Sequence, residues 1–169
     1  MLVLERATLE KASEYLKILD EGRKFQREQG FTQWTDNYPN SETVIKDITC
    51  GVGYAIKFDD KIAGYCCIRF DGEPAYLKID GKWNYDMPYA VVHRLALSAD
   101  FRGTGLTGET WRVISEFCRK NGLSLIRVDT GLQNKVMQHV LEKNGFTRCG
   151  TVSYYGGDAG LRLAYEKKI

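Results

Sequence analysis

Residues 91–110 read VVHRLALSADFRGTGLTGET, and this stretch decides which fold the chain adopts. It opens with an apolar run typical of a buried strand and continues with glycines that precede a helix expected from Glu109 to Lys120. Glycine-rich turns between a strand and a helix bind phosphate groups, because backbone N–H groups and the helix dipole both favour an anion there. The segment GTGLTGET, residues 103–110, is therefore a candidate phosphate-binding loop, and it satisfies or nearly satisfies three phosphate-binding patterns.

The first pattern is the nucleotide-binding P-loop, which Gly103, Gly108 and Thr110 match except at the lysine position. The lysine of that motif lies against the β- and γ-phosphates. Glu109 occupies its place and would repel them. Nucleotide hydrolysis is therefore disfavoured.

The second pattern is the dinucleotide fingerprint G-x-G-x-x-G, which residues 103–108 satisfy. Asp129 follows at about the spacing expected for the carboxylate that binds the ribose. The fingerprint needs its first glycine at the end of the strand, however, and residues 98–102 intervene. Residues 130–169 are also too few to complete a doubly wound sheet. A nicotinamide-dependent oxidoreductase is therefore the weaker interpretation.

The third pattern is R-x-x-G, formed by Arg102 and Gly105. Successive backbone N–H groups after an arginine at a helix start can hold a pyrophosphate. Gly103 and Gly105 let the backbone approach phosphate oxygens without a Cβ in the way. Taken alone, the loop is equally compatible with an ordinary glycine turn that leaves Arg102 in solvent.

The rest of the chain predicts a mixed sheet flanked by helices. Hairpins in the middle and crossovers later favour an α/β (mixed α+β) fold with a central sheet of about seven strands and about four helices. A ligand is expected at the carboxyl end of the strand before the glycine loop, in the only clear parallel unit. The expected strands are 2–4, 53–58, 62–70, 89–97, 125–128, 146–153 and 161–166, and the expected helices are 10–28, one N-capped by Ser41 that stops at Gly51, 109–120 and 135–143.

The composition is that of one ordinary globular domain, expected over residues 1–169, with 43% hydrophobic and 27% charged residues. A net charge of +2 argues against a nucleic-acid partner, which selects a concentrated basic face. The five cysteines are odd in number and lack metal-ligand spacing, so no metal and a reducing cytoplasm are expected. No apolar run reaches the ~18 residues that span a membrane, and the first residues, MLVLERATLEKA, lack the apolar region typical of a signal peptide. A soluble cytoplasmic protein with no membrane partner is expected.

Two segments together resemble the core of the GNAT superfamily of N-acetyltransferases: residues 91–114 and DTGLQNKVMQHVLEKNGF, residues 129–146. Residues 91–114 resemble that family's acetyl-CoA strand and R-x-x-G-x-G/A loop. Residues 129–146 resemble its segment in which an asparagine, here Asn134, precedes a helix that ends at Gly-Phe. The motifs cover roughly residues 89–150, and the order of elements agrees across the chain. Thr107 departs from the pattern, since the family has glycine or alanine there.

The resemblance implies an enzyme that uses acetyl-CoA (coenzyme A). The pyrophosphate would lie on the loop, and the pantetheine arm would pair with the strand before it. A backbone N–H of Leu95 or Ala96 would also stabilise the developing oxyanion, a catalytic role. Asn134 is equally suited to cap the helix that follows it. The implied cofactor-binding residues are Leu95, Ala96, Leu97, Arg102, Gly103, Thr104, Gly105, Leu106, Thr107 and Asn134.

Acetyl transfer to an amine also needs a base, because amines are mostly protonated at neutral pH. His93 is the candidate, since it lies two residues before Leu95 and imidazole titrates near neutral pH. Some relatives carry a histidine or glutamate on this strand, and His93 matches such a histidine in register. The alternative is a half-buried histidine hydrogen-bonded beside Arg94. His139, in the middle of a helix, is expected to be structural.

The proton donor for the leaving thiolate is not determined by the sequence. Many family members place a tyrosine seven residues after the asparagine, but Leu141 stands there and cannot donate a proton. Tyr154, Tyr155 or Tyr85 could replace it, or water could protonate the thiolate.

The acceptor pocket is expected to come from two aromatic segments outside the core motif. Each of these side chains could instead cover the core. An aspartate among Asp36, Asp80 and Asp86 could hold a cationic amine, although each is equally a turn or surface residue. The candidates are Gln33, Trp34 and Tyr38 in the first segment, and Tyr76, Trp83 and Tyr85 in the second.

The sequence therefore predicts an acetyl-CoA-dependent N-acetyltransferase that acts directly on a primary amine of a small-molecule or amino-acid-like acceptor. No Cys–His or Ser–His pairing is evident in the motifs, so no covalent enzyme intermediate is expected. Two alternatives stay open: a CoA-binding regulatory module without strong turnover, motivated by Leu141, and a protein or peptide acetyltransferase. The acceptor, the acyl-chain length and the assembly state are undetermined, with a homodimer among the options.

Overall fold

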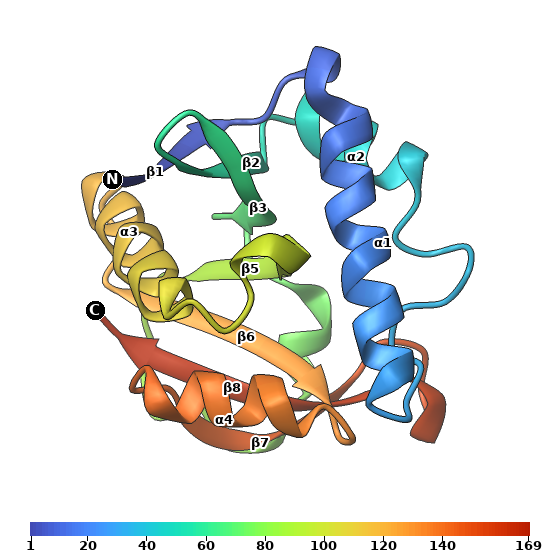
Figure 1. The fold of residues 1–169 in the computed structure, drawn as a ribbon. Helices are drawn as coiled ribbons and strands as arrows, with labels where there is room; N and C mark the ends of the chain where they lie inside the picture. Colours follow the sequence, from blue (N-terminus) through green and yellow to red (C-terminus); the bar gives the residue numbers. More distant parts are fainter. The chain divides into compact units, whose positions relative to one another are not determined.

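The computed structural model describes residues 1–169 and contains eight strands and four α-helices (Figure 1). The strands are β1 (Leu2–Arg6), β2 (Gly53–Phe58), β3 (Lys61–Arg69), β4 (Asp80–Gly81), β5 (Ala90–Leu97), β6 (Leu125–Gly131), β7 (Thr147–Ser153) and β8 (Leu161–Lys168). The α-helices are α1 (Ala12–Glu28), α2 (Ser41–Thr49), α3 (Leu106–Lys120) and α4 (Lys135–Lys143). Short 3-10 helices are η1 (Leu9–Lys11), η2 (Pro74–Lys78), η3 (Ala99–Phe101) and η4 (Asp158–Gly160).

The strands are hydrogen-bonded in the order β1-β2-β3-β5-β6-β8-β7-β4. β5 and β6 run parallel, whereas β1–β2, β2–β3, β6–β8, β7–β8 and β4–β7 are antiparallel. The predicted mixed α/β class is therefore confirmed. The sheet has eight strands where about seven were expected, because Asp80 and Gly81 form a two-residue strand paired with β7.

The contacts of the chain divide it into two compact units. The first contains residues 1–68 and 93–114, and the second contains residues 69–92 and 115–169. The expectation of a single domain over residues 1–169 stays a prediction. Each unit is described by itself below.

The first unit is built on the antiparallel strands β1, β2 and β3, with α1 and α2 as its helices (Figure 1). α1 turns an apolar stripe inward, with Tyr15, Ile18 and Leu19 buried. Rings of Tyr15 and Tyr65 stack with centroids 5.2 Å apart, which joins α1 to β3. The buried core of this unit comprises Ala7, Tyr15, Ile18, Leu19, Trp34, Val44, Ala55, Tyr65 and Ala96.

The second unit is built on β6, β8, β7 and β4 (Figure 1). β6 pairs with β8 along its whole length, from Leu125↔Lys168 to Gly131↔Arg162. A second buried cluster, Tyr76, Val91, Val152 and Ala164, packs against the partly buried Ala75, Ile79, Trp83 and Tyr89. The aromatic segment that follows β3 therefore belongs to the core of this unit.

Several helix ends differ from the sequence prediction. Asn40, not Ser41, caps α2: its Oδ1 accepts from Thr43 N at 3.0 Å, and Thr43 Oγ1 accepts from Asn40 N at 3.3 Å. This reciprocal pair is a capping box, which the sequence discloses only when Asn40 and Thr43 are read together. α3 begins at Leu106, three positions before the expected Glu109.

The early start of α3 follows from its apolar stripe. Leu106 and Thr107 are half-buried and lie four residues before the buried Thr110 and Trp111, so the buried face of the helix continues across Gly108. The Thr110 hydroxyl also donates to the Leu106 carbonyl at 2.9 Å. None of the helices is both long and apolar enough to cross a membrane.

Candidate active site

The turn between β5 and α3 needs glycine at two positions. Gly103 has φ +73° and Gly105 has φ +85°, conformations that residues with a Cβ rarely adopt. Apart from the adjoining residues, no protein atom lies within 4 Å of an ideal Cβ built on either glycine, so both face open space. The Thr104 hydroxyl donates to the Phe101 carbonyl at 2.7 Å, which closes the turn. The turn therefore leaves its backbone uncovered on the side of the two glycines.

Arg102 enters this turn with an unused hydrogen-bond donor. Its guanidinium carbon lies 5.0 Å from the centre of the Phe25 ring. Its Nη2 atom is buried and has no hydrogen-bond partner. A buried guanidinium N–H without an acceptor costs free energy, which a bound anion would recover. Arg102 is half-buried rather than free in solvent, and its role toward a phosphate stays a prediction.

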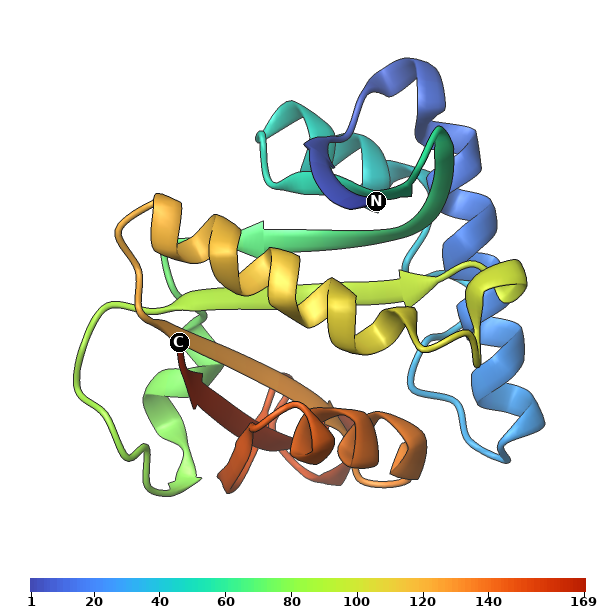
Figure 2. The same ribbon diagram turned by 60° about the vertical axis from the view of Figure 1, so that its left-hand side comes forward.

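The turn is anchored to α1 and β3. Ala99 N donates to Glu21 Oε2 at 2.7 Å, and Ser98 N donates to the Ala63 carbonyl at 2.8 Å. The Phe58 and Phe101 rings meet edge to face at 6.0 Å. Figure 2 shows the turn beside α1, as these contacts require. A turn held from α1, β2 and β3 presents its N–H groups in a fixed direction.

The early start of α3 places Leu106 and Thr107 in its first turn rather than in the loop. The first N–H groups of a helix lack partners within the helix and carry its positive dipole end. Glu109 lies in the same turn, but its carboxylate is paired with Arg112 at 2.9 and 2.5 Å. The hydrogen bond from Arg112 lowers the pKa of Glu109. The negative charge of Glu109, which disfavoured a P-loop, is thus paired with Arg112 of the same helix.

β5 loses the inward–outward alternation of an ordinary strand at its centre. Ala90 to Val92 are buried, and His93, Arg94 and Leu95 are all half-buried before Ala96 is buried again. Arg94 has φ +53°, the left-handed conformation, inside the strand. Such a residue re-aims the backbone and side chains that follow it, as at a β-bulge.

A buried ion pair holds Arg94 in place. Asp47 Oδ2 accepts from Arg94 Nε at 2.9 Å, and Asp47 Oδ1 accepts from Arg94 Nη2 at 2.6 Å. Tyr65 donates to Asp47 Oδ2 at 3.0 Å. Burial and the Asp47 charge raise the pKa of Tyr65 above its ordinary value, so the phenol stays a donor.

Sequence reasoning missed Asp47 altogether. The signal was an aspartate on the apolar face of a helix, because Val44, Asp47 and Ile48 share the i, i+3, i+4 spacing. The exposed fraction of Asp47 is 5%. A carboxylate this buried needs a cationic partner, and the two positions are too far apart in sequence for a pattern to pair them.

The first aromatic segment divides into core and surface. Trp34 is buried in the core of the first unit, and its backbone N–H donates to Gln26 Oε1 at 2.9 Å. Its ring therefore supports the fold rather than an open pocket. Tyr38 is 42% exposed, and its hydroxyl accepts from Arg94 Nη1 at 2.8 Å. Gln33 is half-buried. Tyr38 is thus the candidate of this segment that is linked to β5.

The second aromatic segment surrounds a buried arginine in the second unit. The Arg127 guanidinium lies 4.1 Å from the centres of both the Trp83 and Tyr89 rings. Its Nη2 donates to the Tyr85 carbonyl at 2.6 Å. Trp83 Nε1 donates to the Tyr76 carbonyl at 3.0 Å. The backbone near Trp83 and Tyr85 is therefore fixed, while the Tyr85 side chain stays 38% exposed.

Two tyrosines donate to one carboxylate in the second unit. Tyr76 and Tyr154 donate to Asp129 Oδ2 at 2.7 and 2.5 Å. Burial and the nearby Asp129 raise the pKa of Tyr154 above its ordinary value. A phenol that already donates to a carboxylate and holds its proton tightly is a poor proton donor for a thiolate. Of the other tyrosines considered for this role, Tyr155 is 80% exposed.

Asn134 is the N-cap of α4. Its Oδ1 accepts from Met137 N at 3.1 Å, as the capping interpretation predicts. Leu141, which stands where relatives place a tyrosine, is 1% exposed and packs in the second unit. Capping leaves the amide nitrogen of Asn134 outside this bond, so its expected role toward a cofactor stays a prediction.

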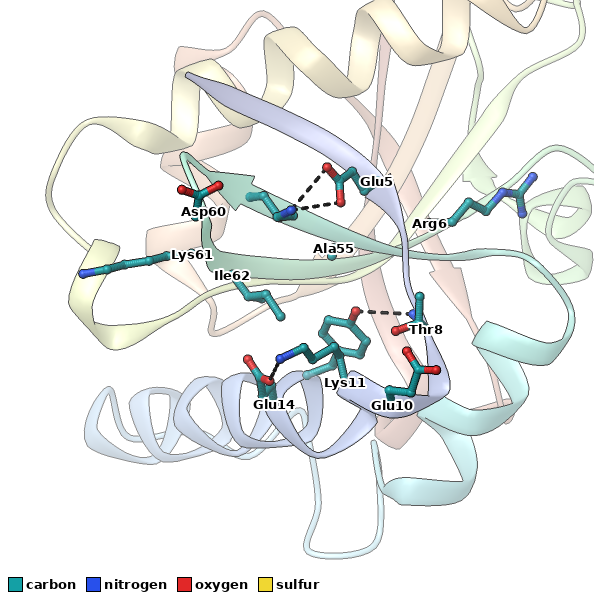
Figure 3. A pocket seen from close by; sticks show the side chains of 12 residues that line it. Glu5, Arg6, Thr8, Glu10, Lys11, Glu14, Ala55, Asp60, Lys61 and Ile62 are labelled. Atoms are coloured by element: carbon teal, nitrogen blue, oxygen red, sulfur yellow. Dashed lines mark hydrogen bonds and ion pairs between the residues drawn. The ribbon is translucent and has the colours of Figure 1, made fainter.

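A separate hollow lies in the first unit, between β1, the β2–β3 hairpin and the start of α1 (Figure 3). Its volume is about 550 Å³. Most of the side chains that line it are charged, and they include two ion pairs, Lys57–Glu5 at 3.1 Å and Lys11–Glu14 at 2.7 Å. None of the predicted site residues is among those that line it. The hollow is therefore distinct from the glycine turn.

The fold is mixed α/β, and a glycine turn precedes α3. The acetyltransferase (GNAT) family profile matches residues 17–146. No curated protein sequence matches the chain. A GNAT-family acetyltransferase from Streptococcus agalactiae 2603 is 32% identical, with a TM-score of 0.88 over 99% of this chain and 95% of that chain. The chain therefore belongs to the GNAT family of acetyltransferases, whose acetyl donor is acetyl-CoA.

Two more distant solved structures share the fold. PaiA N-acetyltransferase from Thermoplasma acidophilum, in complex with coenzyme A, is 16% identical over 100% of this chain and 99% of that chain, with a TM-score of 0.71. An aminoglycoside acetyltransferase in complex with coenzyme A and kanamycin is 18% identical over 99% of this chain and 95% of that chain, with a TM-score of 0.71.

Proposed function

We propose that this protein transfers an acetyl group from acetyl-CoA to a primary amine of a small molecule. The observation that carries the proposal is the turn at residues 102–107. It combines a buried Arg102 donor without a partner, two left-handed glycines beside open space, and the first turn of α3. These are the features that a pyrophosphate needs, because each offers an N–H group or space to its oxygens. The residues present therefore fit the cofactor.

Acetyl-CoA, when bound, supplies a thioester carbonyl that is activated toward amines. The chain's own residues then have three tasks. His93 takes a proton from the acceptor ammonium, directly or through water, so that the nitrogen lone pair can attack. A backbone N–H of Leu95 or Ala96 donates to the carbonyl oxygen as negative charge develops on it. Leu95 to Leu97 hold the pantetheine arm.

The proton for the leaving thiolate is assigned to water. Leu141 offers no donor, and the Tyr154 hydroxyl is already committed to Asp129. The balance is complete without another side chain: the nitrogen loses one proton to His93 before attack and a second to solvent as the C–N bond forms, the C–S bond breaks, and solvent returns one proton to sulfur, so each turnover releases one proton. No covalent enzyme intermediate is needed.

A small-molecule acceptor is supported by two points. The aminoglycoside acetyltransferase with the same fold is described as a complex with kanamycin, a small molecule. In this chain Tyr38 presents an exposed ring linked to β5. A protein or peptide acceptor is the alternative. The cytoplasmic location and a homodimeric assembly stay predictions from the sequence.

The test has two parts. Thermal unfolding is first followed with acetyl-CoA, NADH and ATP, since a ligand at about 100 times its dissociation constant adds ~2.7 kcal/mol of stability. Stabilisation by acetyl-CoA alone is expected. Thiol release is then measured with a panel of small primary amines and with lysine peptides. Turnover confined to peptides would overturn the small-molecule acceptor, and binding without any turnover would favour a regulatory module.

A further inference from the structure

We propose that Asp47 is a positioning residue for acetyl transfer. Through its ion pair with Arg94 it holds the β5 backbone in a left-handed conformation and so sets the direction of the Leu95 N–H. The inference rests on the proposed function, because that N–H matters to the rate only if it meets the developing oxyanion. The established family membership does not assign a role to Asp47, which lies on α2, far from the glycine turn in sequence.

The backbone geometry is the first step. Arg94 and Asp59 are the non-glycine residues with positive φ, and Asp59 lies in the β2–β3 hairpin turn, where aspartate is common. Arg94 lies inside a strand, where a residue with a Cβ is strained at φ +53°. The torsion angles of Arg94 orient the peptide unit that carries the Leu95 N–H. A relaxed Arg94 would therefore turn that N–H elsewhere.

The ion pair is the second step, because it supplies the restraint. Both Asp47 oxygens accept from the guanidinium, at 2.9 and 2.6 Å, and the side chains are only 7% and 12% exposed. A two-point contact fixes the orientation of the planar guanidinium as well as its distance. Burial keeps water from competing for either group.

The support behind Asp47 is the third step. The Tyr65 hydroxyl donates to Asp47 Oδ2 at 3.0 Å, and the Asp47 carbonyl accepts from Val52 N at 2.9 Å. The capping box at Asn40 fixes the start of the same helix. Contacts to its side chain, its backbone and its helix thus fix the position of Asp47. A carboxylate in a fixed position can restrain the Arg94 guanidinium.

An ion pair that served stability alone would not require a left-handed Arg94. This difference defines the test, because glycine adopts φ +53° without strain and alanine does not. The variants are Asp47→Ala, Arg94→Ala, Arg94→Gly and the double variant Asp47→Ala with Arg94→Gly. Glu5→Ala is the matched control: it breaks the Lys57–Glu5 ion pair of the same unit without touching β5.

Initial rates are measured with acetyl-CoA and an amine that the wild type acetylates, so that kcat and both KM values are separated. Asp47→Ala is expected to lower kcat by up to about 100-fold, as misplacement of a reacting group by about 1 Å does, with the KM for acetyl-CoA changed by less than about threefold. The kcat of Arg94→Gly should be at least about ten times that of Arg94→Ala, because glycine adopts the left-handed backbone conformation without strain. The double variant should exceed Asp47→Ala, since it leaves no unpaired buried charge.

Equal kcat values for folded Arg94→Ala and Arg94→Gly, or an unchanged kcat in folded Asp47→Ala, would overturn the proposal. If Asp47→Ala does not fold, the comparison of the two Arg94 variants still decides. The amide signal of Leu95 in a ¹⁵N spectrum gives a readout without turnover: it should move in Asp47→Ala and stay in Glu5→Ala. If the wild type shows no acetyl transfer, the proposed function is refuted. The Leu95 amide signal still tests whether Asp47 fixes the β5 backbone, because that readout does not depend on turnover.

Discussion

At the residue scale, His93 is the side chain on which the proposed proton transfer depends. It is half-buried on β5 directly before the left-handed Arg94. Replacing His93 with alanine should lower kcat by about 10²–10⁴-fold, the usual contribution of a positioned base. Affinity for acetyl-CoA should stay within about threefold, because the proposed phosphate contacts lie in the turn at residues 102–107 and not at His93.

Steady-state kinetics together with isothermal titration of acetyl-CoA separates these two effects. His139→Ala is the matched control, since His139 is the only other histidine and is exposed on α4. A His93→Ala rate within about twofold of the wild type would remove His93 from the mechanism.

Replacing Arg102 should have the opposite effect to replacing His93, because it should lower the affinity for acetyl-CoA. Its buried Nη2 lacks a hydrogen-bond partner within the protein, and a phosphate oxygen would supply one. Arg102→Glu should weaken acetyl-CoA binding by about 100-fold or more, since a hydrogen bond to a charged group is lost and a like charge is placed beside it. The measurement is titration of acetyl-CoA by calorimetry.

Lys24→Glu supplies the control for Arg102→Glu. It makes the same change of charge on α1 in the same unit, at a side chain that is 80% exposed. Equal affinities for both variants would mean that net charge alone, and not the turn, attracts the cofactor.

At the element scale, Asn134 at the start of α4 has two expected roles, capping the helix and contacting the cofactor. Its Oδ1 caps the helix through Met137 N, whereas a cofactor contact would use the amide nitrogen. Asn134→Ala should lower the free energy of unfolding by about 1 kcal/mol, and Asn134→Asp should not, because aspartate caps equally well. Chemical denaturation measures this difference.

Acetyl-CoA affinity then tests the cofactor contact, since Asn134→Asp keeps the helix cap and loses the amide donor. Weaker binding in this variant supports a cofactor contact. Wild-type binding by Asn134→Asp would restrict Asn134 to capping.

The elements also show what a sequence can and cannot disclose. The bounds of β2 and α4 were predicted to the residue, because turn residues and apolar periods mark both ends. The start of α3 was predicted too late, because Gly108 was taken as a turn although the apolar stripe continues through it. β4 was missed, since two residues carry no period.

The candidate site was predictable only in its local part. The glycine turn is contiguous in sequence, so its residues could be named from spacing. Asp47 could not be paired with Arg94, because the contact joins α2 to β5 and depends on tertiary packing. The same reason explains Trp34, whose burial follows from the core that surrounds it.

At the scale of the whole molecule, the fold determines which of the five cysteines can react. Cys66, Cys67 and Cys118 are buried, Cys149 is half-buried, and Cys50 is exposed. Burial raises the pKa of Cys118 to about 12, and burial with the nearby Glu166 raises the pKa of Cys149 to about 11. Because the thiolate is the reactive form, a raised pKa keeps these thiols protonated and unreactive at pH 8.

Titration of the native protein with a thiol reagent at pH 8 should therefore show one fast-reacting cysteine, Cys50, and unfolding in guanidinium should release the other four. Cys50→Ser should remove the fast phase while leaving the slow one unchanged, and acetyl transfer should survive it, because no thiol takes part in the proposed chemistry. Raising the pH toward 11 should add Cys149 next, since its folded pKa is the lower of the two raised values and its side chain is only half-buried. Fast reaction of a buried thiol at pH 8 would show that one of the two units opens under native conditions: Cys66 or Cys67 would identify the first unit, and Cys118 the second.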